Sequence, residues 1–566
     1  MAITTTQDSS FETDTTSLTT TNLTPNAFKR GLDLITYQVL NNSPSVFGVG
    51  TALASDLRNN QDAHPLTYSL ASATLLNLYN PITNDWAGKV NPSLAGIFGA
   101  GAASVFAPSH GFRGTIASGA TTTTVTPSAT LGTTVGVNQL ANRGDGIGYK
   151  IRVIDNGTGG TGKTEERHIV GNTSSTTPLI TLAAPLSFTP VVGSAIEILS
   201  GRVYMLGAGT VAAGIFKWFD PALNLLSGNL ATTNLPATIA TDSSMVALDS
   251  LYTPYFQKPG EGFIEGEYSY NSLSREHQMK ALVATAISAT TLTGQVSGGD
   301  SSVLANEYRN FQIRIVEDLV NPTATGQRRK ITSHTAGVSP IYTVPTWTVT
   351  PSANAKYVVE NANEILLFTN AVATTYTYAA HAIVGGQAAD TWSTTTYGAR
   401  GNAVGAGVMS FQPFGMKLDI AKNARYSQIF SFRGANSTSL DVLDIAGGAN
   451  GTWTNTAPYE GFPAFNTGAC CTYSPVSAPI EPLSGGLDRQ GTCAYIFNAG
   501  TTMLTFDART RTLQPFTRIT IASSTAVVGQ KIASTVITDR RTGLRIPRLL
   551  CAMHSLSTFA GVTVPI

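Results

Sequence analysis

The chain has 566 residues, a formal net charge of +1 and only 12% charged residues, with 42% hydrophobic residues. This length predicts several domains, and the apolar content excludes a disordered chain. The near-zero net charge argues against nucleic-acid binding, which needs a basic excess or a basic patch. Thr, Ser, Asn and 54 glycines supply most of the polarity. Because Thr suits pleated sheet and Gly and Asn suit turns, this composition favours an all-β fold.

At the N-terminus, residues 1–25 are rich in Thr and Ser and predict a flexible arm that orders on a partner. The next segment, 27–41, is compatible with a short helix or a first strand. No basic region followed by an apolar core opens the sequence, so we expect no secretory signal. No apolar run is long enough to predict a membrane span.

An internal duplication dominates the middle of the chain and predicts two homologous small β-domains at 111–200 and 278–361. Ile151–Ile154 matches Ile313–Val316, and Leu140–Asn142 appears to match Leu304–Asn306, with an offset that drifts from 164 to 161. Each copy shows short alternating strands separated by Gly, Pro, Asn or Ser, the pattern of a small β-sandwich or barrel.

A weaker repeat occurs outside these copies. It consists of an apolar strand, an Asp or Asn turn and often a Trp, as in the segments 78–86, 216–224, 440–453 and 504–510. This pattern resembles the blades of kelch-type β-propellers over residues 65–110, 201–265 and 363–566. The resemblance implies blades at 26–110 and 201–277, then the remaining blades and a C-terminal closing strand at 362–566. The two β-domains are expected to leave from loops between blades. A row of separate β-sandwiches is the alternative.

The segment Gly157–Thr164 fits the phosphate-binding pattern GxxxxGK[ST]. A functional loop of that type requires a helix directly after it, whereas the residues from Glu165 to Val170 alternate like a strand. The second copy has Pro322–Arg328 in the same place, which lacks the pattern. We therefore interpret the segment as a hairpin loop and predict no nucleotide cofactor.

No other constellation predicts catalysis, a cofactor or a metal site. Cys470, Cys471, Cys493 and Cys551 have no zinc-ligand spacing, and no calcium loop or nucleophile elbow is present. Among the histidines, His110 and His277 appear to occupy equivalent junction positions of the two copies. Glycosidase candidates, which cannot be paired from sequence, end this sentence: Glu261, Glu265, Glu267, Asp441 and Asp444. Because Asp220, Asp444 and Asp507 recur at the repeated turn, we expect them to cap it. The five tryptophans are expected in cores.

The duplicated module also resembles small β-domains in structural proteins of tailed bacteriophages. The residues that carry this resemblance are Arg314-Ile315, Arg329-Lys330-Ile331, Trp347, Thr350-Pro351 and Tyr357-Val358-Val359. It implies a non-enzymatic virion component of the tail or neck (nozzle, collar or decoration), made in the host cytoplasm. Its partners would be copies of itself and other virion proteins, with the arm and the run Leu549–Ile566 exchanging strands between neighbours. The alternatives are binding of a host-surface glycan and a propeller glycosidase.

Overall fold

The computed structural model describes residues 37–563, apart from 48–50, 58–65, 72–74, 88–101, 144–147, 211–214, 240–241, 252–267, 272–275, 280–281, 295–302, 371, 385–386, 414–426, 456–461, 475–492, 499–501, 509, 519–530, 539–544 and 553–558. The predicted arm, residues 1–25, lies outside the described residues. Within them the fold is all-β and antiparallel, with one 3₁₀ turn, η2 (Pro322–Ala324), and no α-helix. The prediction of an all-β chain is confirmed.

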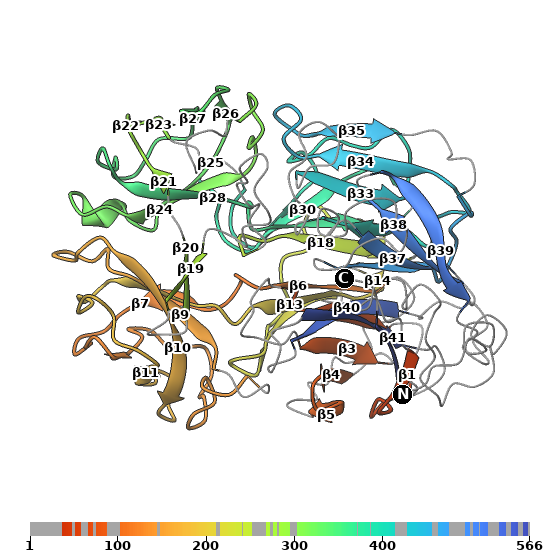
Figure 1. The fold of residues 1–566 in the computed structure, drawn as a ribbon, viewed down its shortest axis with the longest axis horizontal. Helices are drawn as coiled ribbons and strands as arrows, with labels where there is room; N and C mark the ends of the chain where they lie inside the picture. Colours follow the sequence, from red (N-terminus) through yellow and green to blue (C-terminus); the bar gives the residue numbers. More distant parts are fainter. Residues whose placement is uncertain are drawn as a thin grey trace, which may run out of the picture.

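Six four-stranded sheets form a ring (Figure 1). Each innermost strand contacts the innermost strands of two neighbouring sheets, so the sheets follow one another around a common axis as in a β-propeller. From the innermost strand outward, the sheets are β2 (Ala52–Ser55), β3 (Thr67–Ala71), β4 (Leu75–Asn80), β5 (Asp85–Ala87); β6 (Ala103–Ala107), β13 (Arg202–Leu206), β15 (Phe216–Asp220), β16 (Leu225–Leu226); β18 (Ser244–Leu248), β29 (Glu364–Phe368), β30 (Tyr376–Ala379), β31 (Thr391–Ser393); β32 (Met409–Phe411), β33 (Gln428–Phe432), β34 (Leu440–Asp444), β35 (Thr452–Asn455); β36 (Cys470–Tyr473), β37 (Cys493–Asn498), β38 (Thr502–Asp507), β39 (Thr512–Arg518); and β40 (Lys531–Thr538), β41 (Arg545–Ala552), β42 (Phe559–Thr563), β1 (Tyr37–Leu40).

The last sheet is completed by the N-terminal strand β1, which pairs with β42 from Tyr37 opposite Val562 to Leu40 opposite Phe559. The expectation of a C-terminal closing strand was therefore wrong, since the outermost strand comes from the N-terminus. Strands β41 and β42 also pair with each other within the chain. They satisfy each other's backbone groups, which removes the basis for strand exchange by the C-terminal run.

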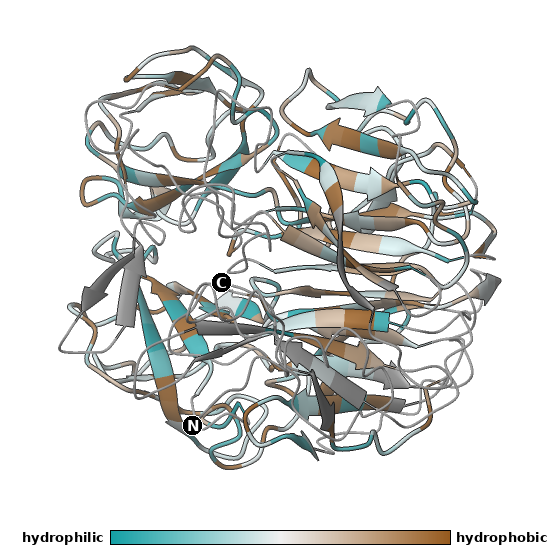
Figure 2. Cartoon of the chain, turned by 45° about the vertical axis from the view of Figure 1, so that its right-hand side comes forward, coloured by the Kyte–Doolittle hydropathy of each residue, from teal (hydrophilic) through white to brown (hydrophobic). Residues whose placement is uncertain are grey.

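Burial in the ring follows strand position. Innermost strands carry small side chains such as Ala54, Ser104 and Ala533, because six strands converge there. Second strands carry large ones, and all five residues of both β29 and β33 are buried. In Figure 2 the strongly hydrophobic segments accordingly lie mainly in the strands. Aromatic and aliphatic side chains thus fill the wedge between sheets, where burial stabilises the ring most.

Each duplicated domain is inserted into a sheet, between its first and second strands. Insert 1 lies between β6 and β13, and insert 2 lies between β18 and β29. The expectation that they leave from loops between blades was wrong. In an antiparallel sheet the first loop and the third turn lie at the same end, so each insert emerges beside outer turns of the ring.

Insert 1 comprises β7 (Arg113–Thr115), β8 (Thr124–Val125), β9 (Lys150–Ile154), β10 (Thr164–Asn172), β11 (Ile180–Leu182) and β12 (Ala195–Ile198). Its sheet order is β7-β12-β9-β10-β11-β8, and a bridge from Ile116 to Pro127 joins the two ends into a small barrel. Insert 2 comprises β21 (Leu282–Val283), β22 (Ala286–Ile287), β23 (Thr291–Thr293), β24 (Gln312–Glu317), β25 (Arg328–Lys330), β26 (Ser333–His334), β27 (Ile341–Thr343) and β28 (Lys356–Glu360), in two four-stranded sheets. Two hairpins remain, β14 (Gly209–Thr210) with β17 (Thr238–Ile239) and β19 (Tyr268–Asn271) with β20 (Glu276–Met279).

Hydrogen bonds correct the alignment of the two copies at one place. The bridge from Val135 to Ser175 in insert 1 corresponds to the bridge from Val303 to Gly337 in insert 2. In both copies the residue after the Val is then capped by a side chain three positions later, at 2.8 Å and 2.9 Å. These segments are therefore related by 168 residues (Val135 and Val303), so the proposed match of Leu140 to Leu304 was wrong. Extra residues in the loop before β9 cause the difference.

Candidate functional site: the junction of the two inserts

The loop that resembles a phosphate-binding motif joins β9 to β10 in insert 1. Thr164 begins strand β10, so no helix N-terminus faces the loop and no phosphate cradle is formed. Instead the carboxylate of Asp155 organises the loop. It accepts hydrogen bonds from the N–H of Thr161 at 2.6 Å, from the N–H of Val191 at 3.0 Å and from the hydroxyl of Ser194 at 2.7 Å. The interpretation of this segment as a hairpin loop is confirmed.

Gly162 of this loop lies directly against insert 2. Its carbonyl oxygen accepts hydrogen bonds from the N–H of Asp318 at 2.9 Å and from the hydroxyl of Thr325 at 3.0 Å. The φ angle of Gly162 is +72°, and a Cβ there would lie 1.9 Å from the carbonyl oxygen of Asp318. Only glycine permits both the left-handed backbone and the close approach. The glycine of the motif thus serves contact between domains.

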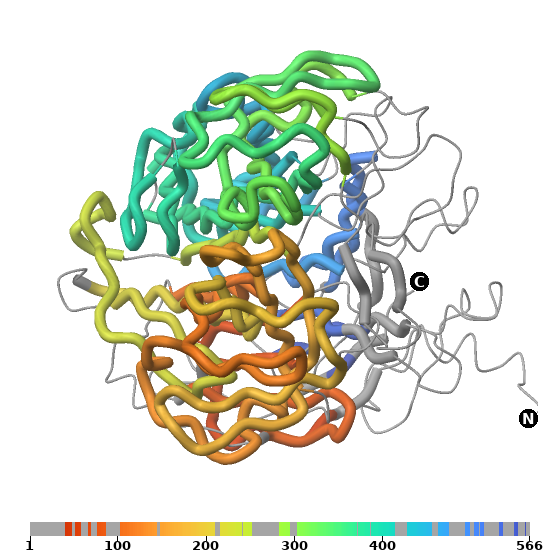
Figure 3. The backbone as a smooth tube through the Cα atoms, turned by 90° about the vertical axis from the view of Figure 1, so that its left-hand side faces the viewer, coloured from red at the N-terminus to blue at the C-terminus, as the bar shows by residue number. Residues whose placement is uncertain are grey.

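A cluster of buried charges continues this junction toward the ring. Within insert 1, Arg152 pairs with Glu197 at 2.6 Å and with Glu166 at 2.8 Å. Across the junction, Arg328 of insert 2 reaches the same Glu197 at 2.8 Å. Glu197 is only 6% exposed, so an unpaired charge there would be costly. The two inserts therefore share a carboxylate, as Figure 3 illustrates by their side-by-side placement.

The cluster has a matching half in insert 2. Arg314, which occupies the position of Arg152 in the duplication, pairs with Glu360 at 3.0 Å, and both side chains are 1% exposed. Burial alone would raise the pKa of Glu197, but Arg328, Arg113 and Arg152 hold that pKa well below its usual range. Both inserts thus keep an ionised carboxylate at the junction at neutral pH, which locks the inserts together.

Insert 1 also rests on the ring at the recurring Asp turn. The carboxylate of Asp220 accepts the N–H of Ala222 at 3.1 Å, the turn role expected for this residue. Ala222 and Leu223 join the hydrophobic core of insert 1. The side chain of Gln139 in insert 1 donates to the carbonyl oxygen of Ala222 at 2.8 Å. A turn of the ring is therefore part of the domain that it carries.

Insert 2 docks in the same manner on the neighbouring sheet. Asp444 caps its turn by accepting the N–H of Ala446 at 3.0 Å, and Asn310 of insert 2 donates to the carbonyl oxygen of Ile445 at 2.6 Å. Ile445 is fully buried in the core that insert 2 shares with the ring. Such docking of both inserts leaves no hinge at these contacts.

The buried residues at the root of insert 1 superficially suggest a nucleophilic triad. Ser109 donates to Asp249 at 2.8 Å, and the Nδ1 atom of His110 lies 3.0 Å from the hydroxyl of Tyr204. The serine thus bonds to the carboxylate rather than to the histidine, and all four side chains are buried. Burial lowers the pKa of His110 well below its usual range, helped by Arg113 and Arg202. The cluster fastens insert 1 to two sheets and offers substrate no access.

His277 does not match His110, as the sequence had suggested. His110 follows β6 by three residues, whereas His277 lies in strand β20, 29 residues after β18. The extra β19–β20 hairpin separates insert 2 from its sheet. Among the described residues no group of three or more His, Cys, Asp or Glu side chains is arranged to hold a metal ion.

The candidate carboxylates do not form a catalytic pair. Glu261, Glu265 and Glu267 lie outside the described residues. Asp441 is fully buried and pairs with Arg400 at 2.6 Å and with Arg433 at 2.9 Å, so it is neutralised. Asp444 caps a turn.

Of the tryptophans, Trp347 and Trp392 lie in cores. The guanidinium groups of Arg202 and Arg400 cover the rings of Trp218 and Trp453 at 3.8 Å and 4.8 Å. Covered rings of this kind are not available for stacking on a sugar. Trp86 is partly buried and contacts Tyr79.

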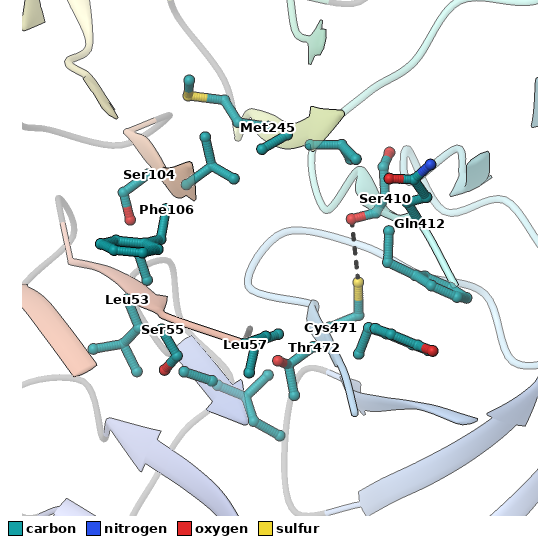
Figure 4. A pocket seen from close by; sticks show the side chains of 18 residues that line it. Leu53, Ser55, Leu57, Ser104, Phe106, Met245, Ser410, Gln412, Cys471 and Thr472 are labelled. Carbon is teal, nitrogen blue, oxygen red and sulfur yellow. Dashed lines mark hydrogen bonds between the residues drawn. The ribbon is translucent and has the colours of Figure 1, made fainter. Parts of the chain in front are cut away.

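A cavity of about 140 Å³ lies where the innermost strands of the ring converge (Figure 4). Its lining includes Ser55, Ser104, Ser410, Gln412 and Cys471 and contains no carboxylate and no histidine. A second cavity of about 100 Å³ shares part of this lining and reaches Lys531. Neither cavity brings an acid and a base together for catalysis.

All four cysteines are free thiols. Burial raises the pKa of Cys470 to about 12 and also raises the pKa of Cys471 and of Cys551. The reactive thiolate is therefore scarce at neutral pH, and these three residues are not nucleophiles.

No helix in the described part of the chain has the length and hydropathy needed to cross a bilayer. Neither a protein-family model nor a curated protein matches the sequence. Among solved structures the chain is similar to Sqt1 of Saccharomyces cerevisiae, with 9% identity, 94% of this chain and 98% of that chain covered, and a TM-score of 0.29. It is also similar to an auxiliary nutrient binding protein of Bacteroides thetaiotaomicron, with 8% identity, 78% and 94% coverage and a TM-score of 0.22. A protein of unknown function from the same bacterium has 10% identity, 78% and 94% coverage and a TM-score of 0.17.

Proposed function

We propose that this protein is a structural component of a tailed-phage particle, placed in the tail or neck, and that it acts by assembling with copies of itself and with other virion proteins. The ring is then a kelch-like propeller that carries two rigid β-domains. The observation that carries the proposal is the junction itself, where both inserts and the ring are locked by buried ion pairs and shared cores. A body of this kind suits permanent contacts better than a catalytic cycle, which often needs moving elements.

Composition supports the same conclusion. A net charge of +1 limits repulsion between copies, and large permanent interfaces are depleted of charge at their centres. Most exposed large aliphatic side chains of the described residues belong to the inserts, among them Val137, Val192, Leu319 and Val320. Exposed apolar side chains that gather in one part of a protein mark contact surfaces.

Peptide mass spectrometry and immunogold electron microscopy of phage particles from the native source test this proposal. We expect peptides of the chain in purified particles and gold at the tail or neck. Absence of the chain from particles that contain the other virion proteins would contradict the proposal. A glycan array with the purified chain tests the alternative of host-glycan binding, which gold on the particle would leave open.

A further inference from the structure

The turn after β24 presents two adjacent aliphatic side chains to solvent. Leu319 is 60% exposed, and Val320, at 74%, is the most exposed large aliphatic residue of the described chain. The turn is firmly built, because the carboxylate of Asp318 accepts the N–H groups of Val320 at 3.1 Å and Asn321 at 2.8 Å. Ser352 donates to the same carboxylate, with its N–H at 2.7 Å. These apolar side chains are therefore displayed on a rigid support.

Insert 1 provides an internal comparison for this turn. There Asp155 occupies the place of Asp318 and also accepts a serine hydroxyl, that of Ser194 at 2.7 Å. The residues that follow Asp155 are polar or glycine, Asn156 to Gly160. The module therefore folds without aliphatic side chains at this turn. Leu319 and Val320 are not required by the fold, which leaves an intermolecular contact as their role.

The two loops meet, and a third exposed aliphatic residue lies beside them. Asp318 donates its N–H to Gly162 of insert 1, and Val192, 63% exposed, belongs to the loop that packs against Gly157. We name Val192, Leu319 and Val320 the tip patch. Strands β12 and β28 return to the ring at their C-terminal ends, so the tip patch lies at the opposite end of the inserts, at the outer edge of the molecule (Figure 1).

We propose that the tip patch binds the tip patch of a second copy of this chain, about a twofold axis. This inference rests on the proposed function of multi-copy assembly. The nearby charges are already paired, with Lys356 to Glu317 at 2.6 Å, so two copies meet without like-charge repulsion. The contact extends the junction through which two homologous domains already pair within one chain. Since the patch is at the edge, the two rings point away from each other.

A twofold contact places each residue near its own copy, which makes disulfide capture a direct test. In the full chain, Val320→Cys under mild oxidation is expected to form a disulfide dimer at least tenfold faster than Val384→Cys. Val384 is an exposed control at 44%, on the ring. Equal rates for both variants, or no dimer from Val320→Cys, overturn the proposal.

Sedimentation velocity of the full chain provides the second measurement. We expect Leu319→Asp/Val320→Asp to weaken self-association at least tenfold, and Val384→Asp to leave it unchanged. Unchanged far-UV circular dichroism confirms folding of each variant. If the wild-type protein associates and the double variant associates equally well, the tip patch is wrong, while virion localisation by immunogold stands or falls independently.

Discussion

Gly162→Ala tests whether the glycine of the loop joins the inserts. The new Cβ would lie 1.9 Å from the carbonyl oxygen of Asp318, which is backbone and cannot rotate away. The loops must separate, which breaks the hydrogen bonds from Asp318 and Thr325 to the Gly162 carbonyl. Two such bonds contribute about 1–3 kcal/mol together, and the left-handed backbone costs Ala about 1–2 kcal/mol more. The expected total is about 2–5 kcal/mol.

Gly159→Ala is the matched control. Gly159 lies in the same loop with a φ of +83°, and a Cβ there meets nothing within 4 Å. It therefore reproduces the backbone strain without the contact. The difference between the two variants isolates the junction, and we expect Gly162→Ala to be less stable than Gly159→Ala by about 1–3 kcal/mol.

Hydrogen exchange followed by mass spectrometry is the assay, because it reports local opening in a multidomain chain. Protection in residues 318–327 of insert 2 should fall in Gly162→Ala and stay at the wild-type level in Gly159→Ala. Equal protection of this segment in both variants would refute the account of the junction, since the steric contact would then have no energetic consequence.

Three further predictions concern charge and thiols. Because the folded-state pKa of Glu197 is depressed, its stabilisation is present above about pH 4.5 and is lost as pH falls through the folded-state value. Glu197→Gln should therefore unfold more easily than wild type at pH 7, and the difference should shrink in acid denaturation below about pH 4; a constant difference would contradict the ion pairs. Arg400→Met leaves the buried carboxylate of Asp441 with only one arginine and should cost about 3 kcal/mol in denaturant unfolding, whereas a neutral effect would show that the pair is dispensable. Cys470 and Cys551 should resist a thiol reagent at pH 8 in the native protein and react in denaturant; rapid native reaction would contradict their raised pKa values.

Sequence patterns predicted the features that depend on local order. Alternation in β9 and β10 and the absence of a helix signal after Thr164 were sufficient to identify a hairpin. The capping role of Asp220 and Asp444 followed from their recurrence at one type of turn. The innermost strands were missed because small side chains such as Ala54 and Ser104 give no strong apolar signal, although convergence at the axis demands them.

Features set by long-range pairing were beyond the sequence. The four-residue strand β1 gains its place from pairing with β42, more than 500 residues away, and nothing local shows this. Placement of the inserts within sheets also required knowing which short strand lies innermost. The charge cluster was missed because Arg152, Glu197 and Arg328 are far apart in sequence. The one available signal was the occurrence of charged residues inside otherwise apolar strands, as in Lys150–Ile154.

The central claim is that the two inserts form one rigid body. Double electron–electron resonance between labels at Val170→Cys of insert 1 and Val338→Cys of insert 2, both about half exposed, measures this directly. The account predicts a single narrow distance distribution in the full chain. A broad or multiple distribution would show that the inserts move independently and would contradict it.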